Sequence, residues 1–563
     1  MHDLVIRNAT LIDGTGAERR TADVAISGEV IADVGHGLGR GRQEINAEGL
    51  ILTPGWVDIH THYDGQATWD PYMTPSSYHG VTTAVFGNCG VGFAPVRKGS
   101  ETYLINLMEG VEDIPETVLA EGMDFTWESF PQYLDTLAAM PRVMDIGAQM
   151  PHAALRFYVM GERGADHAEV PTESEIGEMG RLLEEALNAG ALGFTTSRTV
   201  KHRAKDGRAT PTLSAAEPEL AGLALAMKRA GKGVIEVNSD FGEGDFAYVR
   251  QAAELAGRPL SVLLLQVDNA PELWRETLDQ IEQANRDGLH VTGQVGSRFI
   301  GMMMGLETTV NPFTSHPAWK AMASLTPGER YRKISSDAEL RRTLWQDLPD
   351  NGHTRWLRKA LERAFVLGPD MNYEPDPKDA VALKAEAAGR DRFDLALELM
   401  LENGGKGLLI HPFENYTAGN LDNVRTMLSH PNCIAGLADA GAHVGVIADH
   451  SSATTLLTLW GRDRTRGERL PLEYLVRKQT LDTAVAYGFT DRGVVAPGKR
   501  ADLNLIDFDQ LRVTAPEVVY DLPAGGKRLV QKAEGYRHTF CAGVETLRDG
   551  AFTGALPGRL VRG

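Results

Sequence analysis

Short runs of apolar residues alternate with amphipathic segments through the middle of the chain. In the clearest unit, Thr172 and Glu175 form a capping box ahead of apolar positions that recur every three or four residues. Gly190 supplies the helix stop, and Leu192–Thr196 has the pattern of the next strand. Such alternation is typical of parallel βαβ architecture. Further strand candidates are Leu52–Ile59, Val81–Phe86, Met144–Met150, Val234–Val237, Leu260–Leu265, His290–Val295, Gly407–Ile410 and Ile434–Leu437.

These strands are roughly enough for an α/β fold with a (β/α)8 barrel of the TIM type, which we expect over residues 54–489. A mostly polar stretch from about 305 to 400 contains the helical segments Trp356–Phe365 and Arg392–Leu401. We interpret it as a helical insertion that covers a site. The β-rich ends, residues 1–53 and 490–563, predict one small β-sandwich domain assembled from both termini.

Composition narrows the class of protein. The chain has 563 residues, 42% of them hydrophobic, and a formal net charge of −19. This charge argues against a nucleic-acid or anionic-membrane partner, which would favour clustered Lys and Arg. The three cysteines are too few and too widely spaced for a disulfide framework. No signal-peptide pattern or apolar run of about 18 residues is evident, so we expect a cytoplasmic protein that acts on a small molecule. Such a protein can be a monomer or a homo-oligomer.

The strongest local signal is the pair His60 and His62 in Pro54–His62. Two histidines at i and i+2 of a strand point the same way, so both imidazoles can reach one cation. They follow an apolar strand, and active sites of barrel folds lie at the carboxyl ends of the strands. We therefore predict that both bind a metal, although an isolated His-x-His pair can also be structural.

Cys89 ends a second apolar strand, in Gly80–Gly90. As a thiolate it would be a ligand for zinc or another borderline metal. A free cysteine can equally be a small buried hydrophobe. A nucleophilic cysteine is a third reading, but the nucleophile-elbow motif is not met, because the residue two positions later is Val91.

Asp439 and His411 also follow apolar strands. Asp439 lies in the small-residue segment Gly436–His443, where an acid is well placed to meet a metal-bound water. An Asp in a loop can also be a turn former or a helix cap. His411, in Ile410–Phe413, can likewise be a site residue or a structural residue.

Together these elements resemble the amidohydrolase superfamily and, within it, the N-acyl-D-amino-acid deacylases (D-aminoacylases). The resemblance runs over nearly the whole chain. Its most specific part is Gly87-Asn88-Cys89-Gly90, because most other amidohydrolases carry a modified lysine or a glutamate as the bridging ligand. The remaining matches are Asn8–Gly14, Pro54–His62, Leu155-Arg156 with Met160-Gly161, Gly190–Thr196, Asp491–Gly493 and Pro497–Leu503.

The resemblance implies a role for each matched residue. His60 and His62 would be metal ligands, Cys89 the bridging or tight-site ligand, and Asp439 the catalytic carboxylate and possible ligand. The further metal histidines of that family have no counterpart, because Ile235–Asp240 and Leu263–Val267 contain no histidine. The family's Tyr-Pro-Tyr and His-Pro-Arg segments, which would help to hold a substrate carboxylate, are also replaced.

The remaining ligand set suits one tightly held Zn²⁺ with an open position for water, rather than two ions. Glu236 is the best substitute ligand for a second ion, with Asn238 behind it. We expect a metal-bound hydroxide to attack a C–N amide bond, with Asp439 as general base and then general acid. Loop residues that could bind substrate, or that could simply be solvated, are His152, Arg198 and His202.

Two alternatives remain open. A lactonase, cyclic-amide hydrolase or deaminase could use the same site, and a catalytically silent scaffold could keep the fold without the chemistry. The sequence gives neither the acyl group and amine of a substrate nor its D or L preference.

Overall fold

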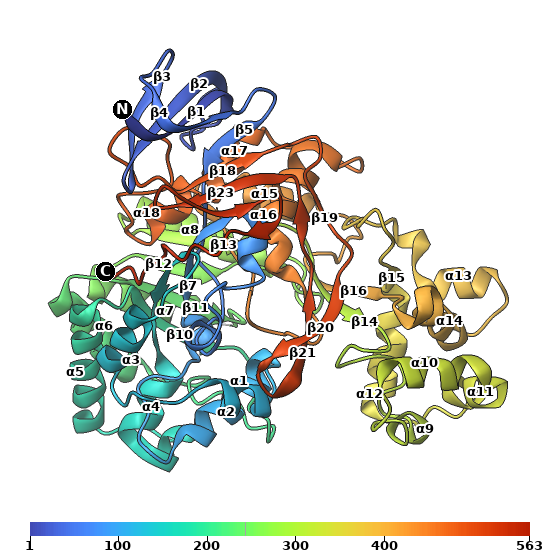
Figure 1. Ribbon diagram of the computed structural model, residues 1–563. Helices are drawn as coiled ribbons and strands as arrows, with labels where there is room; N and C mark the ends of the chain where they lie inside the picture. Colours follow the sequence, from blue (N-terminus) through green and yellow to red (C-terminus); the bar gives the residue numbers. More distant parts are fainter. Residues whose placement is uncertain (243) are drawn as a thin grey trace.

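Parallel strands form the centre of the mixed α/β fold (Figure 1). The computed structural model describes residues 1–242 and 244–563. One sheet has the order β6-β7-β8, and a second has the order β17-β13-β12-β11-β10-β9. Their bounds are β6 Trp56–Asp58, β7 Val81–Phe86, β8 Asp145–Ala148, β9 Met150–Pro151, β10 Gly193–Arg198, β11 Val234–Ser239, β12 Leu260–Leu263, β13 Val291–Val295 and β17 Cys433–Ala435.

Helices follow most of these strands, as the alternating pattern predicts. The capping box at Thr172 is present and begins α5 (Glu173–Ala189), which ends at Gly190 with φ of 114°. The buried face of α5 carries Met179, Leu183 and Leu187, so this predicted helix is confirmed. The others are α1 Glu101–Glu112, α2 Glu116–Gly122, α3 Phe130–Ala139, α4 His152–Met160, α6 Glu217–Ala230, α7 Asp245–Ala256, α8 Leu273–Arg286, α15 Asp422–Leu428, α16 Ser452–Thr458, α17 Leu472–Lys478 and α18 Leu481–Ala486.

Strands from both ends of the chain share one nine-stranded sheet, at the top of Figure 1. Its order is β25-β24-β23-β18-β5-β1-β2-β3, and β4 pairs with β1. The two-sheet sandwich that we expected from the termini therefore takes the form of one branched sheet. The bounds are β1 His2–Leu11, β2 Arg20–Ser27, β3 Val30–Gly35, β4 Gly41–Asn46, β5 Ile51–Pro54, β18 Leu503–Ile506, β23 Tyr536–Cys541, β24 Val544–Arg548 and β25 Ala551–Phe552.

The candidate strand Leu52–Ile59 is two strands. β5 pairs with β18 in the terminal sheet, whereas β6 pairs with β7 in a parallel sheet. The break falls at Gly55, where an added Cβ would lie 2.2 Å from Thr82 Oγ1. The chain therefore passes from one sheet to the other at a point where only glycine fits.

A largely helical segment follows β13 and lies at the right of Figure 1. It packs around its own apolar cluster, which includes Phe313, Leu357 and Phe393. The predicted helix at Trp356–Phe365 starts earlier, as α12, and gives way to a short 3₁₀ helix and a strand. The helices are α9 Pro317–Lys320, α10 Pro327–Ser336, α11 Ala338–Gln346, α12 Gly352–Ala360, α13 Val381–Ala387 and α14 Arg392–Gly405.

The prediction that Gly407–Ile410 is a parallel strand is wrong. This stretch belongs to β16 (Leu409–Glu414), which runs antiparallel to β14 (Ile300–Met304) and to β15 (Phe365–Val366). These partners border and interrupt the helical segment, so β16 returns along it instead of joining the parallel sheets. An apolar run alone does not reveal which partner a strand will find.

A two-stranded ribbon from the C-terminal part of the chain descends beside the helical segment (Figure 1). It consists of β20 (Glu517–Leu522) and β21 (Gly526–Val530). The Tyr520 hydroxyl lies 3.0 Å from Glu307 Oε2, and the Leu529 amide donates to the Val444 carbonyl at 2.7 Å. β19 (Arg512–Val513) and β22 (Ala533–Glu534) pair near its base. Among the described residues, no helix is long and apolar enough to cross a membrane.

Candidate metal centre

Four predicted site residues follow the carboxyl ends of parallel strands. His60 and His62 come directly after β6, and Cys89 lies on a short 3₁₀ helix, Asn88–Gly90, after β7. Asp439 follows β17, and its amide donates to the His60 carbonyl at 3.1 Å. Strand ends that are far apart in the sequence are therefore joined at one point in space.

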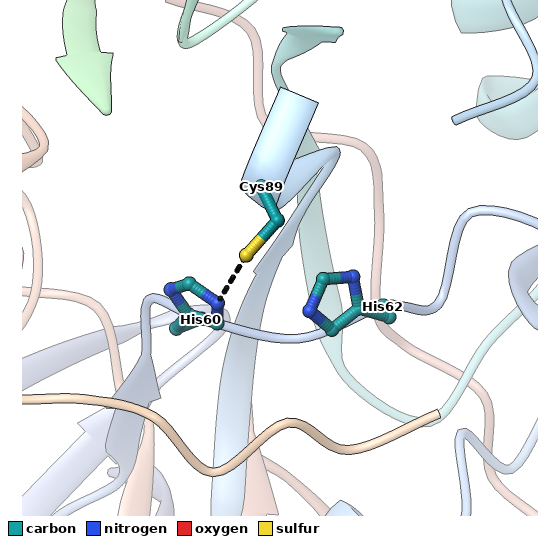
Figure 2. Close-up of side chains that lie close together, drawn as sticks. All are labelled: His60, His62 and Cys89. Atoms are coloured by element: carbon teal, nitrogen blue, oxygen red, sulfur yellow. Dashed lines mark hydrogen bonds between the residues drawn. The ribbon is translucent and has the colours of Figure 1, made fainter. Parts of the chain in front are cut away.

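His60, His62 and Cys89 form a compact buried cluster, and their side chains point toward one another (Figure 2). One ligand atom from each lies within 4.8 Å of the other two. Cys89 Sγ is 3.5 Å from His60 Nε2, and the two imidazole rings have centroids 5.4 Å apart. This is the spacing of donors that can surround one ion.

Asp439 adds a carboxylate to the cluster. Its Oδ1 lies 3.4 Å from His60 Nε2 and 3.8 Å from His62 Nε2. Both Cys89 and Asp439 hold left-handed backbone conformations, with φ of 55° and 47°. Non-glycine residues seldom adopt this conformation, which persists where the surrounding structure imposes it and is frequent at functional sites.

Buried polar partners orient the histidine and the cysteine. Gln294 Oε1 accepts from His60 Nδ1 at 2.8 Å, which leaves Nε2 directed at the cluster. Glu236 Oε2 accepts from the Cys89 amide at 3.0 Å, and Asn238 Nδ2 lies 3.4 Å from Cys89 Sγ. Such outer partners fix the tautomer and direction of metal-binding side chains.

A second acidic contact lies on the far side of His62. Glu112, the last residue of α1, has Oε1 at 3.4 Å from His62 Nδ1 and Oε2 at 3.5 Å from His443 Nε2. The His443 amide also donates to the Glu112 carbonyl. Glu112 thereby joins the α1 end to the loop that carries Asp439.

Burial determines the protonation of this cluster. It lowers the pKa of His60 to about 4 and that of His62 well below its usual value, so both imidazoles are neutral near pH 7. Burial, reinforced by the nearby Glu236, raises the pKa of the Cys89 thiol well above its ordinary range. Burial likewise raises the pKa of Asp439 well above its ordinary range, and that of Glu236 to about 8. Neutral imidazoles are the form that binds a metal, and a cation would favour the thiolate and the carboxylates.

These donors fit a divalent cation. Two neutral imidazoles, a thiol and a carboxylate match the N, S and O ligands of zinc. Within the described part of the chain, His62 Nδ1, Glu112 Oε1 and Glu236 Oε1 are buried and make no hydrogen bond. Unsatisfied buried polar atoms beside a cluster of donors are expected where an ion or water belongs.

A cavity of about 330 Å³ opens above the cluster. Its polar wall includes Glu112, His202, Asn238 and His443. The other lining residues are mostly apolar, and several come from β14, α12, β16 and the loop after Asp439. The apolar residues are Val111, Leu263, Leu265, Ile300, Met302, Trp356, Phe413, Leu437, Val446 and Ile447.

Lys201 is the one lysine or arginine among the described residues that line this cavity. Its ammonium forms an ion pair with Glu414, which lines the same cavity. This cationic side chain at the cavity therefore already has an anionic partner.

The other predicted substrate residues lie in different surroundings. His202 lines the cavity, with Nε2 at 3.3 Å from Asn238 Nδ2. Glu236 stands behind Cys89, as described above. His152 lies away from the cavity, between Thr196 Oγ1 at 2.9 Å and Glu219 Oε1 at 3.1 Å.

Arg198 and His411 are also occupied elsewhere. Arg198 pairs with Asp245 at 3.1 Å and donates to the Ala215 carbonyl at 2.7 Å. The His411 ring lies edge-on to the Trp356 ring, with centroids 6.2 Å apart. Neither Arg198 nor His411 is among the residues that line the cavity.

Sequence reasoning missed three residues of the site. Glu112 closes a helix far upstream, and Gln294 is an uncharged residue in β13, so neither has a local motif. His443 offered a usable signal, because it lies four residues after Asp439 in the same small-residue loop.

The family model of the amidohydrolase family matches residues 43–552. The chain belongs to the amidohydrolase family. It is accordingly a hydrolase that acts on carbon–nitrogen bonds other than peptide bonds, and the resemblance to D-aminoacylase-like members is confirmed.

Individual relatives agree with this assignment. The N-acyl-D-aspartate deacylase of Alcaligenes xylosoxydans xylosoxydans is 27% identical over 518 residues, which are 91% of this chain and 86% of that protein. The D-aminoacylase of the same organism is 34% identical over 195 residues, 34% of this chain and 37% of that protein. The solved N-acyl-D-glutamate deacylase of Bordetella bronchiseptica superposes with a TM-score of 0.65 at 23% identity, covering 100% of both chains, and thus shares the fold.

Proposed function

We propose that the chain is a metal-dependent deacylase that hydrolyses the amide bond of a small N-acyl compound. The observation that carries this proposal is the buried His60–His62–Cys89 cluster, with Asp439 Oδ1 at 3.4 Å from His60 Nε2, at the base of the cavity. The full-length relatives with this reaction in their names support the bond type.

We further propose that the two parallel sheets close into one eight-stranded barrel over residues 54–489, with the terminal sheet as a separate small domain. Two observations support closure. β8 and β9 are separated by one residue, and Thr61 forms a parallel bridge with Ala440, beyond the ends of β6 and β17. The cluster would then lie at the carboxyl-end face, where the active sites of such barrels are found.

One tightly bound Zn²⁺ held by His60, His62, Cys89 and Asp439 is the metal content that we propose. The solved N-acyl-D-glutamate deacylase contains zinc, which supports the choice of metal. Glu236 and Glu112 are the described carboxylates nearest to the cluster that could help to hold a second ion. When bound, such a cation supplies a Lewis acid and lowers the pKa of water to about 7.

We assign the other steps of hydrolysis to individual side chains. Asp439 accepts the proton of the attacking water and returns it to the leaving nitrogen, as a general base and then a general acid. We assign Asn238 and His202, on the polar wall, as residues that contact the substrate. Glu112 lies beside both His62 and His443, at 3.4 and 3.5 Å. The apolar wall excludes water from the reacting bond.

A neutral substrate of the same site is the second candidate. Because Lys201 is paired with Glu414, no described residue of the cavity offers a free cation to a substrate carboxylate. This pairing favours an amide without a carboxylate, a cyclic amide or a lactone over an N-acyl-D-amino acid.

Purified protein supplemented with zinc and assayed on a panel tests the proposal. The panel holds N-acyl-D- and N-acyl-L-amino acids, neutral N-acyl amides, hydantoins and lactones. We expect about one zinc per chain and hydrolysis of at least one amide class. Hydrolysis of lactones alone would favour the second candidate, and less than about half an equivalent of metal with no turnover would indicate a silent scaffold.

Asp439→Asn is the decisive variant. It should lower kcat by about 10²–10⁴-fold because the general base is lost. Zinc content, measured by atomic emission after loading with excess zinc, should change little because His60, His62 and Cys89 remain. Asp350→Asn, at an exposed position with 87% of its side chain accessible, is the matched control and should retain full activity. Undiminished turnover in Asp439→Asn would refute the assigned role.

A further inference from the structure

A second cavity of about 310 Å³ adjoins the one above the metal cluster. It lies under the loops that follow β10, β11 and β12. Four residues line both cavities and therefore stand at their junction: Lys201, Asn238, Leu263 and Leu265. A molecule bound at the cluster has this second space directly beside it.

The second cavity is chiefly apolar. Its apolar lining residues are Val200, Phe241, Leu263, Leu264, Leu265, Val267, Ala270 and Leu273. A cavity with these residues favours an apolar ligand, because burial of each methylene group contributes about 0.8 kcal/mol.

Both charged groups on its rim have partners within the protein. Lys201 forms its ion pair with Glu414. Asp240 accepts from Thr199 Oγ1 at 2.6 Å and from the Val200 amide at 2.8 Å. A polar or ionic substituent in this cavity would therefore compete with these contacts.

The position of Asp439 indicates whether the acyl side or the amine side of the substrate amide lies in the second cavity. Asp439 lines the first cavity but not the second, whereas Asn238 lines both and lies 3.4 Å from Cys89 Sγ. We place a leaving nitrogen protonated by Asp439 in the first cavity, which Asp439 lines. The other side of the amide, the acyl side, then points past Asn238 toward the second cavity.

From this arrangement we infer that the substrate is an amide with an extended apolar acyl chain, and that the second cavity holds this chain. The inference rests on the proposed deacylase function and adds the substrate class. It assigns Leu265, Val267, Ala270 and Leu273 as residues that determine acyl-chain length.

Two substrate series test it: N-acyl-D-leucines and neutral N-acyl-4-nitroanilides, each from acetyl to dodecanoyl. In at least one series kcat/KM should rise, by up to about fourfold for each added methylene, until the cavity is filled. A flat or falling dependence in both series would overturn the inference.

Ala270→Trp locates the effect in the second cavity. Ala270 is half-buried, so the larger side chain would occupy the cavity, and the ratio of kcat/KM for decanoyl over acetyl substrates should fall at least about tenfold. Leu273→Trp is a second filling variant in case the first folds poorly. Ala247→Trp, at an exposed position on the neighbouring helix α7, is the matched control and should leave the ratio unchanged.

Calorimetric binding separates this inference from the proposed function. N-dodecanoyl-D-leucine and the neutral dodecanoyl 4-nitroanilide are each titrated into two proteins. One carries Asp439→Asn alone, and the other carries Asp439→Asn together with Ala270→Trp. Tight binding that Ala270→Trp weakens would support the acyl-chain cavity even if no amide were hydrolysed, which would refute the deacylase function alone. Binding that is absent, or equally strong for acetyl and dodecanoyl compounds, would overturn the acyl-chain inference whatever the activity.

Discussion

Cys89 is the residue that most directly sets the kind of metal this centre would hold. Its thiol is 4% exposed, adjoins His60, and is positioned by the left-handed backbone at φ 55°. The following Gly90 allows this, because an added Cβ there would lie 2.9 Å from the backbone of Thr196 and Ser197. A sulfur ligand among nitrogens and oxygens favours zinc over the hard ions magnesium and calcium.

Replacing this sulfur should weaken metal binding. In Cys89→Ser we expect zinc affinity to fall at least about tenfold, which is in the range seen for disturbed metal sites. With Co²⁺ in place of zinc, the near-ultraviolet band from thiolate to cobalt should be absent in Cys89→Ser. Cys433→Ser removes another buried cysteine, on β17, and should keep both the affinity and the band. An unchanged band in Cys89→Ser would show that the thiolate is not a ligand.

At the scale of elements, the inserted helical segment and the β20–β21 ribbon form the surroundings of the cavity. The segment brings Trp356 of α12 to the apolar wall, and the ribbon contacts Glu307 and Val444 from the other side. Both elements come from parts of the sequence that lie far from His60. Their contribution is to the shape of the cavity, whereas the metal ligands come from the ends of the parallel strands.

Trp356→Ala should therefore affect substrate binding more than stability. Trp356 is 45% exposed, so its truncation removes part of the cavity wall at small cost to the core. We expect KM for amides with bulky amine groups to rise about threefold to tenfold, with kcat changed less and the melting temperature little changed. Leu383→Ala on α13, 47% exposed, is the control. A loss of kcat at unchanged KM would contradict a role in substrate binding.

At the scale of the whole molecule, a buried ionic network joins the terminal sheet to the parallel strands. Asp145 on β8 pairs with Arg492 Nη1 at 2.9 Å and with Arg500 Nε at 3.0 Å. All three side chains are almost fully buried. Removing one member of such a network leaves uncompensated buried charge, which costs more than the network itself contributes.

Asp145→Asn should consequently destabilise the protein by about 3–5 kcal/mol, measured by chemical denaturation of metal-loaded protein. Asp549→Asn breaks an exposed pair with Arg537, where the Asp side chain is 62% exposed, and should change stability by at most about 1 kcal/mol. Equal effects of the two substitutions would show that the buried network does not hold the sheet to the strands.

A buried histidine elsewhere in the core makes stability depend on pH. His79 Nε2 donates to the Gln531 carbonyl at 2.8 Å, and Nδ1 accepts from Thr454 Oγ1 at 2.9 Å. Burial lowers its pKa from 6.5 to about 4. His450, whose ring centroid is 5.8 Å away, is shifted in the same direction, by burial first and then by His79.

The sign of the effect follows from this lowered pKa. In the unfolded chain His79 is protonated below about pH 6.5. In the folded protein it is protonated only below about pH 4. The stability tied to neutral His79 is thus present above pH 6.5 and is lost as the pH falls toward 4, by up to about 3 kcal/mol. His79→Gln should flatten the dependence of the melting temperature on pH within this window. His36→Gln, at an exposed position, should not, and an identical slope in both variants would refute the assignment.

The sequence by itself determined the local chemistry and many of the elements. Apolar runs between helix caps predicted β7, β10, β11, β12 and β13, because strand and helix periodicity are local properties. The His60-x-His62 spacing placed two imidazoles on one face of the chain, and the motif around Cys89 indicated the family that the match over residues 43–552 confirms.

Tertiary structure decided what depends on contacts between distant segments. It divided Leu52–Ile59 between two sheets, turned β16 antiparallel, and brought Glu112, Gln294 and His443 to the metal cluster. It also directed His152 and Arg198 to structural partners away from the cavity. Local pattern specifies which element forms, but the partner of a strand edge or a buried side chain is chosen by packing across the whole fold.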